Sequence, residues 1–161
     1  MEGRHLPDTS ALAKLSYELS LRTLSQQEAT LNELRARTGT LIGAASIVTS
    51  FLGGAAISKH GLDAWGVLAL VGFVGSIALA TWVLLPKEHL IFSIQGSALF
   101  EDEVRADVFE IGETHRRLAY WLDAYHARNE PKLDSLFTSY RASTALLLVE
   151  VVFWIVQLAV S

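Results

Sequence analysis

Three long apolar runs constrain the fold of this chain more than any other feature of its sequence. They are Thr38–Ile57, Ala64–Leu85 and Ala142–Val160, with 20, 22 and 19 residues. Crossing the hydrocarbon core of a bilayer takes about 20 mostly apolar residues in a helix. Nearly all charge lies outside the runs, although charged residues make up 19% of the chain. The sequence therefore predicts an all-α membrane protein with three transmembrane helices.

The basic residues predict how these spans are oriented. Of the 13 Lys and Arg, 12 lie before the first run or between the second and the third, and only Lys59 lies in the short connector after the first run. Cytoplasmic loops carry an excess of Lys and Arg. We therefore expect a multi-pass protein whose N-terminus is cytoplasmic. We expect no cleavable signal peptide, because residues 1–37 are polar and the first apolar run is too long for one.

The polar segments predict a cytoplasmic helical bundle that continues the spans within a single unit, 1–161. Between Ala11 and Arg37 there is no Gly or Pro, and leucines recur at helical spacings of three, four and seven. Residues 10–37 are therefore expected to form a cytoplasmic amphipathic helix that runs into the span 38–57. Residues 64–85 form the second span, and a cytoplasmic helical segment, 97–140, leads into the third span, 142–160.

Two details of this bundle are further predictions. Asn129, Glu130 and Pro131 are expected to break the helical segment 97–140. A long apolar stripe on so few cytoplasmic helices favours a homo-oligomer, in which copies bury it together. The alternative is that the two cytoplasmic helices of one copy simply pair with each other.

Small residues recur in the first two spans at the spacing that lets helices approach closely. In lipid, van der Waals contact drives helix packing, and small residues four apart permit it. The helix-packing candidates are Gly39, Gly43, Ser46, Ser50, Gly54, Gly72 and Ser76. They predict either a seam between copies or ordinary packing of the first two spans as a hairpin.

The third span carries the one residue within the runs whose presence costs substantial free energy, Glu150. A charged side chain near the membrane centre costs about 3 kcal/mol, which the apolar residues of this span outweigh. Ser143, Glu150 and Gln157 are seven apart and so lie along one side of a helix. This polar stripe should face another helix or water, since intramembrane carboxylates avoid lipid.

Two hypotheses follow for the polar stripe. In one, several copies place Glu150 in a ring that lines a water-filled, cation-favouring pore. In the other, Glu150 hydrogen-bonds Ser46, Thr49, Ser50 or Ser76 within the bundle.

Other classes of site find no support in the sequence. There is no cysteine, and the five histidines are scattered, so we expect no metal site and no cofactor. No nucleophile, phosphate-loop or dinucleotide motif appears, so we expect no catalytic residue and no enzyme. A net charge of -4 does not argue for nucleic acid.

Basic residues next to the spans are candidates for binding a ligand phosphate or lipid headgroups, and the alternative is a solvated face that only anchors the protein. These candidates are Arg35, Arg37, Arg116, Arg117, Arg128 and Lys132.

The layout, with short fragments, resembles a known family. An N-terminal helix carries Leu24–Glu28 and passes through Leu34–Leu41 into a small-residue span, and a second span ends at Leu84–Pro86. A cytoplasmic segment then carries Arg117–Leu122, and Asn129–Leu133 leads into the last span. This is similar to the small bacterial membrane effectors of antiphage defence, particularly Pycsar transmembrane effectors and the related SLATT-type effectors.

The resemblance implies a protein of the bacterial inner membrane. A cyclic pyrimidine nucleotide would activate it, and the effector would then impair the membrane of the infected cell. No ligand-binding residue of the family maps onto a position of this sequence. Two other functions remain open from the sequence: a small constitutive oligomeric ion channel, and a membrane scaffold that recruits a partner through its cytoplasmic helices.

Overall fold

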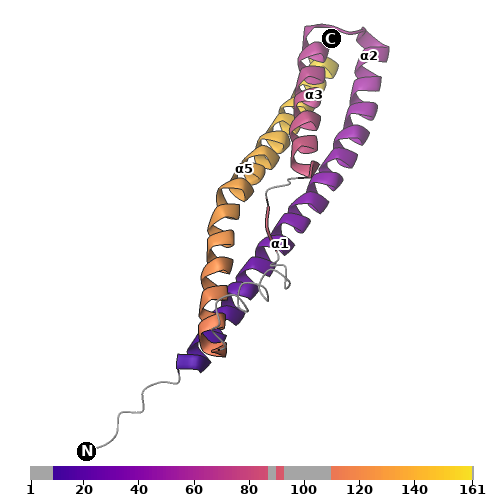
Figure 1. The fold of residues 1–161 in the computed structure, drawn as a ribbon. Helices are drawn as coiled ribbons and strands as arrows, with labels where there is room; N and C mark the ends of the chain where they lie inside the picture. Colours follow the sequence, from indigo (N-terminus) through magenta and orange to yellow (C-terminus); the bar gives the residue numbers. More distant parts are fainter. Residues whose placement is uncertain (1–8, 87–89, 93–109, 161) are drawn as a thin grey trace, which may run out of the picture. The chain divides into compact units, whose positions relative to one another are not determined.

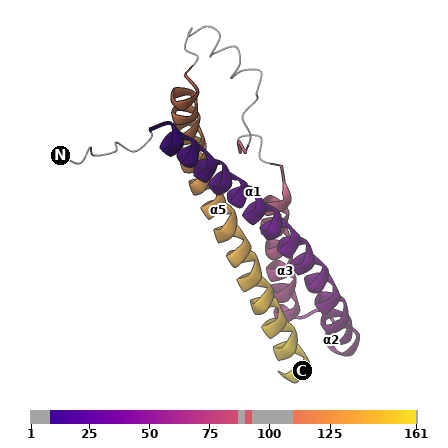
Figure 2. The ribbon, with the colours of Figure 1, turned by 90° about the horizontal axis from the view of Figure 1, so that it is seen from below.

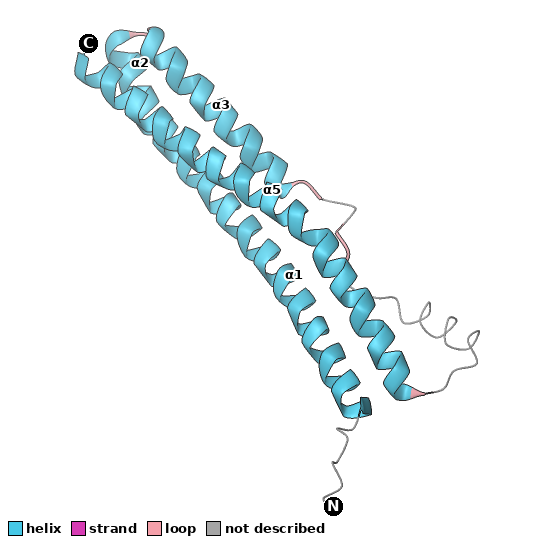
Figure 3. Cartoon of the chain, turned by 90° about the vertical axis from the view of Figure 1, so that its left-hand side faces the viewer, coloured by secondary structure: helices cyan, strands magenta, loops and turns pink. Residues whose placement is uncertain are grey.

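The computed structural model describes residues 9–86, 90–92 and 110–160, and this part of the chain contains helices and loops but no strand (Figures 1 and 3). In chain order the elements are α1 (Thr9–Val48), the π-helix η1 (Thr49–Gly53), α2 (Gly54–His60), α3 (Ala64–Leu84) and α5 (Ile111–Val160). Three helical stretches, Thr9–Lys59, α3 and α5, are long and apolar enough to cross a membrane. The predicted all-α class with three candidate spans is confirmed.

The first helical stretch continues without a loop from the polar N-terminal segment through the first apolar run. Its 40-residue α1 is followed directly by η1 and α2. The absence of Gly and Pro over Ala11–Arg37 explains why nothing interrupts α1 early. The π-helical turn at Thr49–Gly53 was not predicted. Because a π-helix closes i→i+5 hydrogen bonds, it shifts the residues that follow around the helix axis.

Local signals set both ends of α3. Asp63 caps its start, since its side chain accepts a hydrogen bond of 2.9 Å from the backbone N–H of Gly66. The helix ends one residue earlier than the predicted span, at Leu84. Leu85 is extended (φ -58°, ψ 137°), as expected for the residue before Pro86.

The predicted break at Asn129–Pro131 is wrong, because α5 runs through Pro131 as one helix of 50 residues. A proline removes one backbone hydrogen bond inside a helix. Here, buried side chains on both sides of the proline, Asn129, Leu133 and Leu136, keep the helix in place. The segments predicted as 97–140 and 142–160 are thus one element from Ile111 onward, and residues 97–109 lie outside the described residues.

The chain divides into two compact units. The polar unit comprises residues 1–31 and 88–132, and the apolar unit comprises residues 32–87 and 133–161. Each contains part of α1 and part of α5, and α3 belongs to the apolar unit.

In the polar unit, the two helical segments pack against each other. Leu24, Leu31, Leu118 and Leu122 are buried, and the rings of Tyr17 and His115 stack with centroids 5.4 Å apart. Within one copy, these two helical segments therefore pair with each other. The first leucines of the predicted stripe, Leu12, Leu15 and Leu19, are about half exposed within this unit.

In the apolar unit, α5 packs against both other helical stretches. Trp154 forms a buried cluster with Ala56 of α2 and Ala69 of α3. The end of α5 lies near the connector between α2 and α3 (Figures 1 and 2), where Gln157 Nε2 donates a 2.9 Å hydrogen bond to the backbone oxygen of Gly61. Small residues and one large indole thus form the centre of this unit.

Candidate functional site

A row of fully buried side chains runs along α5 at every seventh residue. Its members are 0 to 2% exposed: Leu122, Asn129, Leu136, Ser143, Glu150 and Gln157. A spacing of seven keeps one helical seam facing its neighbours, as in coiled coils. The predicted polar stripe Ser143, Glu150 and Gln157 is the last half of this row, and all three residues lie inside the apolar unit.

Ser143 forms a reciprocal contact with Ser76 of α3. Ser76 Oγ donates to the backbone oxygen of Ser143 at 2.9 Å, and Ser143 Oγ donates to the backbone oxygen of Ser76 at 2.8 Å. Both side chains are at most 1% exposed. Small hydroxyl residues on both helices let the backbones approach closely enough for this exchange.

Glu150 lies between α3 and the π-helical turn. Its Oε1 lies within hydrogen-bond distance of Oγ1 of Thr49, the first residue of η1, and it accepts a hydrogen bond of 3.2 Å from Trp154 Nε1. Its Oε2 is buried and has no hydrogen-bond partner among the described residues. Thr49 is one of the four partners that the sequence suggested for this carboxyl group.

Glycines on the facing helices make room for Glu150 and for the indole next to it. A Cβ on Gly72 would lie 3.4 Å from the Glu150 Cβ, and a Cβ on Gly53 would lie 2.9 Å from Trp154 Cζ2. α3 thus approaches α5 at Gly72, and η1 approaches it at Gly53. Because Glu150 is enclosed within one copy, a pore lined by a ring of Glu150 side chains requires the bundle to rearrange.

The π-helical turn is what brings Thr49 and Gly53 to this site together. The buried residues of α1 also recur every seventh position, at Leu24, Leu31, Thr38 and Ala45. The next position in that series is Leu52, but Gly53 is the buried residue. One extra residue in the turn explains this offset, and π-helical turns often occur at functional sites.

The small-residue candidates separate into two groups. Gly72 and Ser76 contact α5, as described above. Gly39, Gly43, Ser46, Ser50 and Gly54 are exposed in the single chain, and a Cβ on any of these three glycines would meet nothing within 4 Å. The hairpin packing considered from the sequence therefore does not use this second group, which lies on an open face of the first helical stretch.

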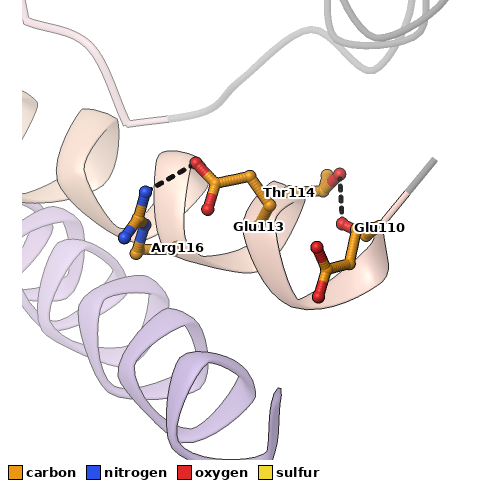
Figure 4. Close-up of polar contacts among 4 residues, drawn as sticks. All are labelled: Glu110, Glu113, Thr114 and Arg116. Atoms are coloured by element: carbon orange, nitrogen blue, oxygen red, sulfur yellow. Dashed lines mark hydrogen bonds and ion pairs between the residues drawn. The ribbon is translucent and has the colours of Figure 1, made fainter. Parts of the chain in front are cut away.

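The basic candidates do not converge on one place. Arg116 pairs with Glu113 at 2.8 Å on the first turns of α5 (Figure 4), where Thr114 Oγ1 also donates to the backbone oxygen of Glu110 at 3.3 Å. Arg117 lies over the ring of Trp121, 5.8 Å from its centroid.

The remaining basic candidates differ in burial and pairing. Arg37 forms an exposed ion pair with Glu33, while Arg35 has a buried Nε without a hydrogen-bond partner among the described residues. Arg128 is exposed and Lys132 is half-buried.

One of these residues, Arg116, lines an open hollow of about 440 Å³ in the polar unit. Its other lining residues come from the first turns of α1 and from α5: Thr9, Leu12, Ala13, Ser16, Ala119, Tyr120 and Asp123. The volume is within the usual range for small-molecule sites. The hollow contains one cation, Arg116, and one carboxylate, Asp123, so its charge is balanced.

The sequence reasoning missed a buried polar network around Asn129 in the polar unit. Asn129 Nδ2 donates to the backbone oxygen of Ile91 at 2.8 Å, and the backbone N–H of Ile91 donates to Asn129 Oδ1 at 3.3 Å. Gln27 Nε2 donates to the backbone oxygen of His126 at 3.1 Å. The sequence did contain a signal for this network, because Asn129 lies two heptads before Ser143 in the same buried row.

Comparison with protein-family models, curated proteins and solved structures gives no match to this chain. Within the described ranges, no group of three His, Cys, Asp or Glu side chains could hold a metal ion.

Proposed function

We propose that the protein is a membrane effector without enzymatic activity. In this proposal it assembles in the bacterial inner membrane and stays closed until a cytoplasmic signal makes it impair the membrane. The observation that carries the proposal is the enclosed Glu150, whose Oε2 lacks a partner within the described part of the apolar unit. Intramembrane carboxyl groups are costly and generally mark a functional pathway. The bundle closed around Glu150 represents the resting state.

The signal in this proposal is a cyclic pyrimidine nucleotide, as the family resemblance implies. The hollow beside Arg116 and Tyr120 in the polar unit supports a binding site for it. Tyr120 is 70% exposed and can stack on a base, and a guanidinium can bind a phosphate once Glu113 releases it. Asp123 opposes an anion there, so the nucleotide must be tested directly.

Co-expression tests the proposed activity. Cells that make both this protein and an active pyrimidine cyclase should take up a membrane-impermeant dye and stop growing, and cells that make either one alone should not. Glu150→Ala should abolish dye uptake at equal expression, whereas Val149→Ala, at an exposed neighbouring position, should not. Dye uptake that Glu150→Ala leaves unchanged contradicts the role of this carboxyl group.

The same experiment separates the two alternative functions. Leakage without any cyclase indicates a constitutive channel. No leakage under any condition favours the scaffold, for which the half-exposed Leu12, Leu15 and Leu19 of the polar unit are the specific supporting observation.

Binding of the signal is tested on purified protein by titration calorimetry with cyclic cytidine and cyclic uridine monophosphates. Arg116→Ala and Tyr120→Ala should weaken binding about tenfold or more, as expected for loss of a charge-assisted hydrogen bond or a stacking contact. Arg128→Ala is the matched control, since Arg128 is exposed and does not line the hollow. Equal affinity in all variants places the ligand elsewhere.

Assembly in this proposal uses the open face of Gly39, Gly43, Ser46, Ser50 and Gly54. The natural chain has no cysteine, so a single introduced cysteine reports on one position. Gly43→Cys should give disulfide-linked dimers in membranes, and Val74→Cys, which is 64% exposed on α3, should not. Cross-linking from Val74→Cys alone contradicts the proposed seam.

A further inference from the structure

The hydroxyl group of Thr49 lies within hydrogen-bond distance of two oxygen atoms. One is the backbone oxygen of Ala45, at 2.9 Å, and the other is Oε1 of Glu150. A hydroxyl group has one hydrogen to donate, and a backbone carbonyl can only accept. If Thr49 donates to Ala45, its contact with Glu150 needs a hydrogen that Glu150 itself carries.

Other hydroxyl groups of the same helical stretch show where the hydrogen of Thr49 goes. They donate to the backbone oxygen four residues earlier, at distances of 2.7 to 3.2 Å, and these residues are Thr23, Thr30, Thr38, Thr40, Ser46 and Ser50. Thr49 repeats this geometry with Ala45. Its hydrogen is therefore assigned to Ala45, which leaves its oxygen lone pairs for Glu150.

The two carboxyl oxygens of Glu150 are in unequal surroundings. Oε1 contacts Thr49 and also accepts from Trp154 Nε1, which can only donate. Oε2 is buried without a donor among the described residues. A carboxylate would leave half of its charge on an oxygen with no hydrogen bond, a state that a low-dielectric interior strongly disfavours. A neutral acid avoids this.

No opposite charge faces Glu150 from the elements packed against it. Residues 38–57, which include η1, and residues 64–85, which include α3, contain no Lys, Arg, His, Asp or Glu. On α5, Glu150 is the one ionisable residue of these types between Ala142 and Val160. The ion pairs found in the described part of the chain lie elsewhere, at Lys14–Glu18, Arg37–Glu33 and Arg116–Glu113.

We propose that Glu150 is a proton-binding site. In the closed bundle it is a neutral acid whose O–H donates to Thr49 Oγ1, and Thr49 in turn donates to the backbone oxygen of Ala45. Loss of the proton removes the donated hydrogen bond and places a negative charge between η1 and α3. The site therefore links proton release to separation of α5 from the π-helical turn. A further step, in which this separation opens a path through the membrane, rests on the proposed function.

Infrared spectroscopy of the purified protein in lipid tests the protonation state directly. The difference spectrum between the natural protein and Glu150→Gln isolates one carboxyl group. The expected result is the C=O stretching band of a protonated carboxyl group that Glu150→Gln lacks. Carboxylate bands in its place overturn the proposal.

A matched pair at Thr49 tests the direction of the hydrogen bond and does not depend on the folding of Glu150→Gln. Thr49→Ser keeps the acceptor, and Thr49→Val removes it at nearly the same volume. The band should stay in place in Thr49→Ser and shift to higher frequency in Thr49→Val, because the acid O–H loses its acceptor. A band at the same frequency in both variants overturns the assigned donation.

Dye release from liposomes that contain the activated protein then tests the link to opening. Glu150→Gln, whose amide has no acidic proton to release, should release less dye than the natural protein. A protonated band without any dye release means that the proton site stands and the proposed function fails. Dye release without the band means that the proposed function stands and the proton site fails.

Discussion

A Cβ atom on Gly53 would lie 2.9 Å from Cζ2 of Trp154, so the indole occupies the space that the missing side chain leaves. Both residues are buried, and Trp154 also donates its Nε1 hydrogen to Glu150. The position of the carboxyl group thus depends on a glycine in the π-helical turn. It depends equally on an indole one turn further along α5, and this pairing gives the first prediction.

Gly53→Ala should destabilise the protein by about 1–3 kcal/mol, because the added methyl group overpacks against a rigid ring. Gly54→Ala is the matched control. A Cβ there meets nothing within 4 Å, and alanine favours helix over glycine by up to about 1 kcal/mol. The free energy of unfolding in detergent micelles is the measurement. Equal effects of the two substitutions would contradict the close approach of η1 to Trp154.

The contact between Ser76 and Ser143 gives a second prediction. Each hydroxyl group donates to the other residue's backbone oxygen, so removal of either one loses a buried hydrogen bond. Such bonds between membrane helices contribute about 0.6 kcal/mol on average and about 1.7 at most. Ser76→Ala and Ser143→Ala should each cost that much, and a double-mutant cycle should show coupling between them. Ser58→Ala, whose hydroxyl group is exposed, should have little effect. The coupling between Ser76 and Ser143 comes from the contact between the two hydroxyl oxygens, which lie 3.0 Å apart, and strictly additive losses would mean that the hydroxyl groups do not interact.

The buried amide of Asn129 gives a third prediction. Its side chain exchanges two hydrogen bonds with the backbone of Ile91, and Asn129→Ala leaves both backbone groups without that partner. The expected loss is about 1–3 kcal/mol of unfolding free energy. Hydrogen exchange at the amide of Ile91 should also become faster. Arg128→Ala, at an exposed neighbouring residue, should change neither quantity, and protection that persists in Asn129→Ala would contradict the contact.

The periodic features of this fold were predictable from the sequence, and the features that depend on distant contacts were not. Spacing alone identified Ser143, Glu150 and Gln157 as one buried side of α5, because side-chain direction follows directly from helix geometry. The helix through Pro131 was not predictable from local preference, since the burial of Asn129, Leu133 and Leu136 outweighs the lost hydrogen bond.

The π-helical turn and the roles of the small residues also depend on tertiary contacts. Nothing in Thr49–Gly53 marks a π-helix, whose benefit is the fit of Thr49 and Gly53 to Glu150 and Trp154 on another helix. Likewise, glycines at a spacing of four look alike in sequence. Only the packed structure distinguishes Gly72, which touches α5, from Gly39 and Gly43, which face open space.

The end of the buried row gives the last prediction, a rescue. A Cβ on Gly66 would lie 2.7 Å from Gln157 Oε1, while Gln157 Nε2 bonds the backbone oxygen of Gly61. Gly66→Ala and Gln157→Ala should each lower the unfolding free energy, the first by a clash and the second by loss of a hydrogen bond. The double variant should lose less than the sum by about 0.5–3 kcal/mol, because the truncated Gln157 no longer meets the new methyl group. A cycle of unfolding measurements tests this, and a double variant with the full summed loss would place Gln157 away from the start of α3.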